Sequence, residues 1–242
     1  MSVTILTIES ELESAERLGF ATDLELDPSF DGTVIRWGNS TIYGGREFSR
    51  VVNPAESIAL NVHKLNALRK LSNVVKTPRA FVTKVPSGVT ALLRSIKHGE
   101  EATFKIVKGP HDVPNDHYAT TWIHTDLEYR VWFAWDKTIT AKRVPIDGDE
   151  EQAEEKNSEF PCRREWGYKF IDSTPQALHT QVLRAAREIG LTLGAADVLV
   201  RGGEFIFLEL NSAPSIDHRR LEEFFVRHIN HRLRPARQTV QV

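Results

Sequence analysis

Apolar and polar positions along the chain follow two rhythms, which predicts a mixture of β-strands and amphipathic helices. The runs Ala195–Val200 and Phe205–Leu210 have the length of buried strands, and Arg201–Glu204 between them contains two glycines. This pattern predicts a β-hairpin with a glycine turn. Further strands are expected at Val3–Ile8, Thr33–Trp37, Ala102–Lys108, Tyr118–Ile123, Tyr129–Trp135 and Thr138–Val144.

Helical spacing of apolar residues predicts four helices between and after these strands. Proline in the first turn and glycine just past the end mark the limits of several of them. The helices are expected from Asn53–Pro54, with Asn53 as N-cap, to about Leu71; over Val89–Ile96; from Thr174–Pro175 to Gly190; and from Asp217 through a core face of Leu221, Phe224, Phe225 and Ile229. This mixture indicates an α/β (α+β) protein with one large domain or two small lobes.

Composition narrows the class of protein but not its chemistry. The formal net charge of −2 gives no global reason to expect nucleic acid or an anionic membrane as partner, although a local basic patch leaves nucleic acid open. No run is long enough to cross a bilayer and the polar start is not a signal peptide, so we expect a cytoplasmic protein. The single cysteine, Cys162, excludes an internal disulfide and a thiolate zinc site. The oligomeric state is left open.

Three side chains with oxygen atoms interrupt the apolar pattern of the expected hairpin. Glu209 and Asn211 are two residues apart and therefore share a face, and the antiparallel partner strand can bring Asp197 opposite them. Two carboxylates and a carboxamide suit a hard cation such as Mg²⁺, which usually keeps waters or substrate phosphates as further ligands. Each residue alone has a simpler explanation: a strand end, a solvated face or a turn. Their joint arrangement favours a metal site.

The spacing of these residues resembles that of a known superfamily. An acid on one strand, followed by Glu-x-Asn-x-x-Pro at the end of the next, is similar to the metal-binding hairpin of ATP-grasp enzymes, the carboxylate-amine and carboxylate-thiol ligases. Asp197, Glu209 and Asn211 match the positions that hold the metals bridging the ATP phosphates in that superfamily. Short ATP-grasp proteins of bacteriophages and bacteria look closest, and a phage-encoded chain would act in the host cytoplasm.

The resemblance implies an ATP-grasp fold, in which two lobes with antiparallel sheets clasp ATP together with Mg²⁺ or Mn²⁺. It divides the chain into a short N-terminal α/β segment over residues 1–76, a small nucleotide-binding lobe over 77–125, and a C-terminal lobe over 126–242 that contains the metal-binding hairpin. The small lobe would end in a hinge, where main-chain groups of Thr121, Trp122 and Ile123 read the adenine edge. Glu128, just after the hinge, resembles the acid that binds the ribose hydroxyls.

Basic side chains are expected near the phosphates. Lys108 looks most like the superfamily lysine that contacts ATP phosphate and Lys105 is second, since alternation puts the two on opposite faces of a regular strand. Lys142 resembles a phosphate-contacting base, and Arg130 would point into the same cleft. Lys64 lies in the helix that begins with Asn-Pro, as in the superfamily. Each assignment has an alternative. Lys64 could be a solvated charge on its helix, and Lys105 and Lys108 could be lysines at a strand edge.

Two segments depart from the superfamily or add to it. The glycine-rich lid expected after Lys108 is replaced by residues 109–117, with one glycine and two prolines, so the lid would be short and stiff, or its place would be taken by side chains such as His111 and His117. The acidic run at 147–155 is expected to be solvated. Arg163 and Arg164 follow it and would neutralise phosphate charge or bind a carboxylate; alternatively, they balance the acidic run.

The chemistry implied by the resemblance is ATP-dependent formation of a C–N bond. A carboxylate attacks the γ-phosphate, and an amine captures the resulting acylphosphate. Arg130, Lys142, Arg163 and Arg164 would stabilise charge on the transferring group together with the metal. Both substrates would be small molecules or peptides, whose identity the sequence does not reveal. Two other functions stay open: a nucleotide-binding protein without catalysis and a kinase-like phosphotransferase.

Overall fold

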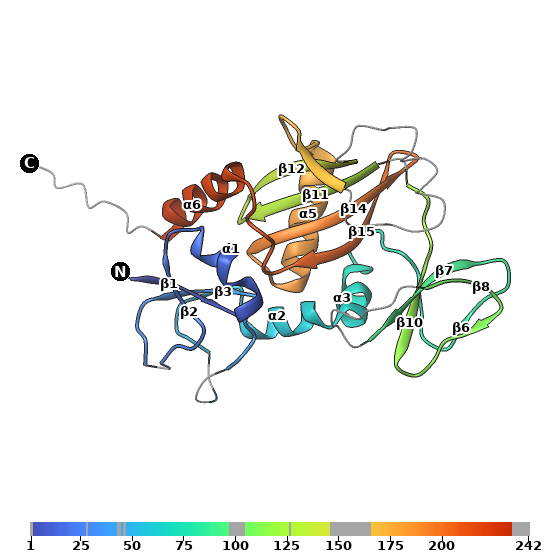
Figure 1. Cartoon of the computed structure of the whole chain (residues 1–242), viewed down its shortest axis with the longest axis horizontal. Helices are drawn as coiled ribbons and strands as arrows, with labels where there is room; N and C mark the ends of the chain where they lie inside the picture. Colours follow the sequence, from blue (N-terminus) through green and yellow to red (C-terminus); the bar gives the residue numbers. More distant parts are fainter. Residues whose placement is uncertain are drawn as a thin grey trace, which may run out of the picture.

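Figure 1 shows a computed structural model of the chain, in which an N-terminal module, a small lobe and a C-terminal lobe follow one another. The structure describes residues 2–27, 29–42, 45, 47–96, 105–125, 127–145 and 166–233. The acidic run and the expected phosphate ligands Arg163 and Arg164 lie outside these residues. Among the helices in the described ranges, none combines the length and apolar character that crossing a membrane requires.

The N-terminal module is a parallel sheet with the strand order β2-β1-β3-β4. Parallel strands need cover on both faces, and α6, the last described helix, closes part of one face. The rings of Trp37 and Phe225 meet edge to face there, with 5.4 Å between their centroids, which joins β3 and α6 in one core. The elements are β1 (Val3–Thr7), η1 (Glu9–Glu11), α1 (Leu12–Glu16), β2 (Ala21–Asp23), β3 (Thr33–Trp37), β4 (Val51–Val52) and α6 (Arg219–Leu233).

Two short helices, α2 (Ala55–Val62) and α3 (Lys64–Leu71), follow where one helix was expected. They meet at His63, whose ψ of 81° ends the first helix and begins the second. The side chain of Glu47 accepts the main-chain N–H of Ala55 at 2.8 Å, so a distant glutamate satisfies this helix start. The expectation that Asn53 is the N-cap is therefore wrong.

Asn53 instead joins the N-terminal module to the C-terminal lobe. Its backbone has a φ of 59° and its side chain is buried. Its amide donates to the carbonyl of Leu193 at 2.9 Å, and its oxygen accepts the N–H groups of Thr192 and Leu193 at 2.7 and 3.0 Å. One side chain thus completes the start of a strand 140 residues away.

The small lobe is an antiparallel sheet with the order β5-β10-β7-β8. Its central β7 occupies Thr90–Ser95, so the helix expected over Val89–Ile96 is wrong. Ala91, Leu92 and Leu93 are all buried, and burial on both faces removes the alternation that marks a strand. The elements are β5 (Ala80–Phe81), β6 (Lys84–Val85), β7, β8 (Lys105–Lys108), β9 (His111–Asp112) and β10 (His117–Thr121).

The C-terminal lobe is an antiparallel sheet with the order β13-β12-β11-β14-β15. Helix α5 (Gln176–Ile189) covers one face and ends, as expected, at Gly190 with a φ of 88°. On β11, the side chains of Tyr129, Val131 and Phe133 point to α5. The strands are β11 (Leu127–Ala134), β12 (Lys137–Pro145), β13 (Trp166–Phe170), β14 (Leu193–Arg201) and β15 (Glu204–Asn211).

The expected hairpin is present as β14 and β15. Gly202 and Gly203 form its turn with φ values of 56° and 80°, a conformation that favours glycine at both positions. Asp197 pairs with Glu209, but Val198 pairs with Phe207, so Leu208 is the extra residue of a β-bulge. The hairpin prediction is confirmed, and the bulge is an addition to it.

Replacing Asn53 by alanine should destabilise the protein by about 3 kcal/mol, because buried main-chain groups of Thr192 and Leu193 lose their partners. Urea unfolding followed by circular dichroism would measure the change. The control is Asn73→Ala, because Asn73 is exposed at the end of α3. Equal midpoints for the two variants would contradict the bridging role of Asn53.

Candidate nucleotide and metal site

The three expected metal ligands lie together on the face of the C-terminal sheet that points away from α5. We call this the acid face and define it by Glu128, Arg130, Asp197 and Glu209, which the strand register places on one side. Asp197 is directly opposite Glu209, and the amide of Asn211 donates to Asp197 Oδ2 at 3.3 Å. The arrangement inferred from alternation is therefore present.

Each of the two acids has a basic neighbour. Lys64 Nζ, from the start of α3, is 3.3 Å from Glu209 Oε2, and Arg130 Nε is 3.5 Å from Asp197 Oδ1. Burial raises the pKa of Asp197 to about 6, and the charges of Glu209 and Glu128 add to the rise, while Arg130 opposes it. The carboxyl is thus held where its charge is poorly solvated.

The donor set fits a hard divalent cation. Asp197 Oδ1 is buried and, although Arg130 Nε lies 3.5 Å away, forms no hydrogen bond within the described residues, so this oxygen can still accept a bond to a cation. No three histidine, cysteine, aspartate or glutamate side chains converge on one point in the described ranges, so protein acids alone would not complete a coordination shell. Two carboxylates and a carboxamide leave positions for phosphate oxygens and waters, as Mg²⁺ requires.

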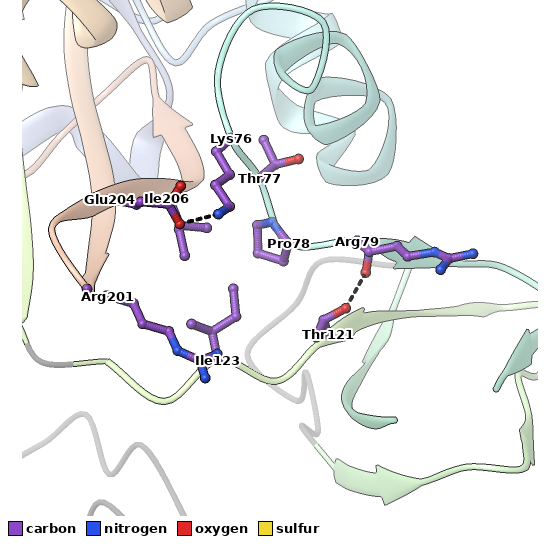
Figure 2. A pocket seen from close by; sticks show the side chains of 10 residues that line it. Lys76, Thr77, Pro78, Arg79, Thr121, Ile123, Arg201, Glu204 and Ile206 are labelled. Carbon is purple, nitrogen blue, oxygen red and sulfur yellow. Dashed lines mark hydrogen bonds and ion pairs between the residues drawn. The ribbon is translucent and has the colours of Figure 1, made fainter. Parts of the chain in front are cut away.

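A cavity of about 470 Å³, which we call the hinge cavity, opens at the hairpin tip, between the two lobes. Figure 2 shows Thr121 and Ile123 of the expected hinge on one side and Arg201, Glu204 and Ile206 of the hairpin on the other. The linker after α3 forms the remaining wall and is anchored to β15, because Lys76 O accepts the N–H of Phe207 at 2.8 Å. Lys76, Thr77, Pro78 and Arg79 line this wall. Two of the three hinge residues therefore border the cavity.

Glu128 lies on the acid face between this cavity and the paired acids. Its register partner on β14 is Leu199, which pairs in turn with Ile206 of the cavity wall. Arg143 donates to Glu128 Oε2 at 2.9 Å. β14 advances about 13 Å from Arg201, at the cavity, to Asp197, at the paired acids. The cavity, Glu128 and the acids therefore lie one after another in a line along the sheet. An extended ligand can follow this line.

Lys142 does not lie on this line. It pairs with Tyr129, whose side chain faces α5, whereas Arg130 pairs with Ala141. Directly paired residues point to the same side of a sheet, so the expectation that Lys142 and Arg130 share a cleft is wrong. Arg143, one residue later, has the position expected of Lys142. The error arose because alternation separates neighbours but does not say which of them faces the cleft.

The small lobe presents two residues toward the acids. Arg94 on β7 pairs with Tyr118 on β10, and the two side chains are hydrogen-bonded. Burial raises the pKa of the Tyr118 hydroxyl, and the negative charge of Glu209 contributes to the rise, so Tyr118 lies within electrostatic reach of the acid face. Sequence analysis missed Arg94 because it lies in the segment assigned to a helix.

Lys108 and Lys105 lie on opposite faces of the small-lobe sheet, as alternation predicted. Lys108 pairs with Thr90, on the same face as Arg94, whereas Lys105 pairs with Leu93, which belongs to the core of the other face. Thr90 O accepts the N–H of Trp122, so Lys108 lies at the hinge end of the lobe. Lys108 therefore has the better position for a nucleotide.

Residues 109–117 do not form a lid over the cleft. His111 pairs with Val85 in the small sheet of β6 and β9. Val85 and Val113 belong to the small-lobe core, which lies on the same face of the sheet as Leu93. This connection thus packs on the face opposite Arg94 and Lys108. The short, stiff lid expected at this position is wrong because the segment covers the far side of the sheet.

Comparison with known proteins gives a match at the level of structure. Neither the protein-family models nor the curated proteins compared with the sequence match it. The macrocyclase MdnC bound with the precursor peptide MdnA, from Microcystis aeruginosa MRC, aligns with a TM-score of 0.60 and 16% identity over 98% of this chain and 100% of that one. The chain has the ATP-grasp fold.

Two further structures support the same ATP-grasp assignment. The ATP-grasp ligase PsnB complexed with a minimal precursor has a TM-score of 0.62 and 13% identity, over 94% of this chain and 99% of PsnB. The D-alanine–D-alanine ligase from Bacillus anthracis complexed with ATP has a TM-score of 0.55 and 12% identity, over 88% of this chain and 86% of the ligase. The fold expected from the hairpin residues is confirmed.

The register predicts different effects for two adjacent basic residues. Arg143→Met should weaken binding of an ATP analogue about tenfold, because Glu128 loses its partner on the acid face. Lys142→Met should change the affinity less than twofold, because its side chain is on the α5 side. Calorimetric titration with the analogue and Mg²⁺ measures both. A larger loss for Lys142→Met than for Arg143→Met would contradict the assignment of faces.

Proposed function

We propose that the protein is an ATP- and Mg²⁺-dependent carboxylate-amine ligase. The line from the hinge cavity through Glu128 to the paired acids Asp197 and Glu209 carries the proposal, because it matches the order of base, ribose and phosphates in a nucleotide. The ATP-grasp fold and its ligase neighbours, some complexed with ADP and Mg, support it. The cytoplasmic location expected from the sequence belongs to the same proposal, because ATP is available there.

ATP would bind with its base in the hinge cavity. Main-chain groups of Thr121, Trp122 and Ile123 would read the adenine edge, and the apolar side chains of Pro78 and Ile206 would contact its ring. Glu128 would accept hydrogen bonds from the ribose hydroxyls with the carboxylate oxygen that Arg143 does not occupy. Lys108 would contact the nucleotide from the small lobe.

The phosphates would lie between the lobes. Arg94 approaches from the small lobe, and Arg130 and Lys64 flank the acids, so three cations surround the place where phosphate charge must be stabilised. Asp197, Glu209 and Asn211 would hold Mg²⁺ or Mn²⁺, which supplies charge neutralisation on the phosphate oxygens when bound. Arg163 and Arg164 stay candidates for the same task.

The reaction would proceed in two transfers. A substrate carboxylate oxygen attacks the γ-phosphorus, the bond to the bridging oxygen breaks, and ADP leaves with an acylphosphate remaining. An amine then attacks the acyl carbon, phosphate departs, and the amine proton passes to solvent or a base. Arg94 and Arg130 would hold the reacting groups in position, which is the main catalytic effect such a site can provide. Several structural neighbours bind precursor peptides, so a peptide carboxylate is the first substrate class to test.

Hydroxylamine trapping tests the proposal without knowledge of the amine. Incubation with ATP, Mg²⁺, hydroxylamine and a set of peptides and carboxylic acids should give a hydroxamate, detected by mass spectrometry, because hydroxylamine captures acylphosphates. Asp197→Asn and Glu209→Gln should reduce the product at least a hundredfold and leave the melting temperature within a few degrees, since each amide has nearly the shape of the carboxylate that it replaces. A stable phosphorylated product that resists hydroxylamine would indicate a phosphotransferase instead.

Arg94→Gln should lower the rate of ATP-dependent hydroxamate formation at least tenfold, because the small lobe loses the cation that is hydrogen-bonded to Tyr118, within electrostatic reach of Glu209. The matched control is Lys105→Gln, which removes a cation from the far face of the same sheet and should change the rate less than twofold. If the two variants lose equal activity, the cleft is not on the Arg94 face.

A further inference from the structure

The arrangement of charges on the acid face is symmetrical. Lys64, Glu209, Asp197 and Arg130 follow one another across the site, with a cation on each outer side and the two acids between them. The two carboxylates are directly paired across β14 and β15, so about 5 Å separates their Cβ atoms. The protein thus supplies as many positive as negative charges in this row.

Lys64 has an unfavourable place for a purely structural lysine. It is the first residue of α3, where the main-chain N–H groups carry partial positive charge and acidic side chains are favoured. The first turn of α3 contains no acidic residue of its own. The compensating carboxylate comes from Glu209, a residue far along the chain. The position of Lys64 is therefore explained by what it does at Glu209 rather than by what it does in the helix.

This arrangement leaves room for one divalent cation among the protein acids. A cation between Asp197 and Glu209 would bind the Glu209 oxygen that Lys64 does not contact and the Asp197 carboxylate, whose Oδ1 lies 3.5 Å from Arg130 Nε but forms no hydrogen bond within the described residues. A second one, on the outer side of Glu209, would have to replace the Lys64 ammonium, which is 3.3 Å from Glu209 Oε2 with 22% of its side chain exposed. Like charges at such a distance repel strongly in a partly buried site.

We propose that Lys64 acts as a built-in cation in place of a second metal ion, so that one nucleoside triphosphate binds with a single divalent cation. The inference rests on the proposed function in that a triphosphate must occupy the acid face. Lys64 is then a positioning residue: it fixes the Glu209 carboxylate toward the metal and adds its charge next to the phosphates.

The number of bound metal ions tests this inference directly. Mn²⁺ is titrated into the protein with saturating AMP-PNP, a non-hydrolysable ATP analogue, and free Mn²⁺ is measured by electron paramagnetic resonance. The wild type should bind one Mn²⁺ per chain. Lys64→Met should bind two, because the outer side of Glu209 is then available, and Lys64→Arg should again bind one. Lys70→Met, at the exposed end of the same helix, should behave as the wild type.

Two Mn²⁺ ions in the wild type, or one in Lys64→Met, would overturn the inference. Binding of AMP-PNP is measured in the same samples by calorimetry, which separates this inference from the function on which it rests. If the analogue binds with two metal ions, the proposed function stands and only the role of Lys64 fails. If the analogue does not bind to the wild type, both fail.

Discussion

The register between β14 and β15 is the constraint on which the whole site depends. Strict alternation from Glu209 would turn Phe207 and Phe205 to the acid face. The extra residue of the bulge, Leu208, turns these phenylalanines into the core and directs Ile206 to the hinge cavity. A single strand can therefore supply a polar ligand, a cavity wall and core residues, which a regular strand of this sequence could not.

The remaining elements bring cations to that strand from three parts of the chain. Lys64 arrives from the helix after the N-terminal module, Arg130 from the neighbouring strand of the same sheet, and Arg94 from the small lobe. Asn53 and Asn61 hold these parts in place, since both donate side-chain amide protons to main-chain carbonyls of the hairpin strands. The site is thus assembled by contacts that are distant in sequence.

Sequence reasoning worked where one face of an element is buried and the other is not. The hairpin, its three oxygen-bearing side chains and α5 all have a clear period, and the structure has them as expected. It failed at β7, because a strand buried on both faces has no alternation, and this failure also concealed Arg94. It failed again at Lys142 and at Asn53, where a tertiary contact decides between two local arrangements that the sequence allows equally.

The packing of α6 against the N-terminal sheet has a consequence for biosynthesis. Strands β1 and β3 complete their core with Phe225 and Ile229, and Ser14 accepts a hydrogen bond from the main chain of Ile216. These partners follow both lobes in the sequence, so the N-terminal module cannot complete its core before α6 has been translated. A nascent chain stalled before α6 would therefore expose the apolar face of its first sheet.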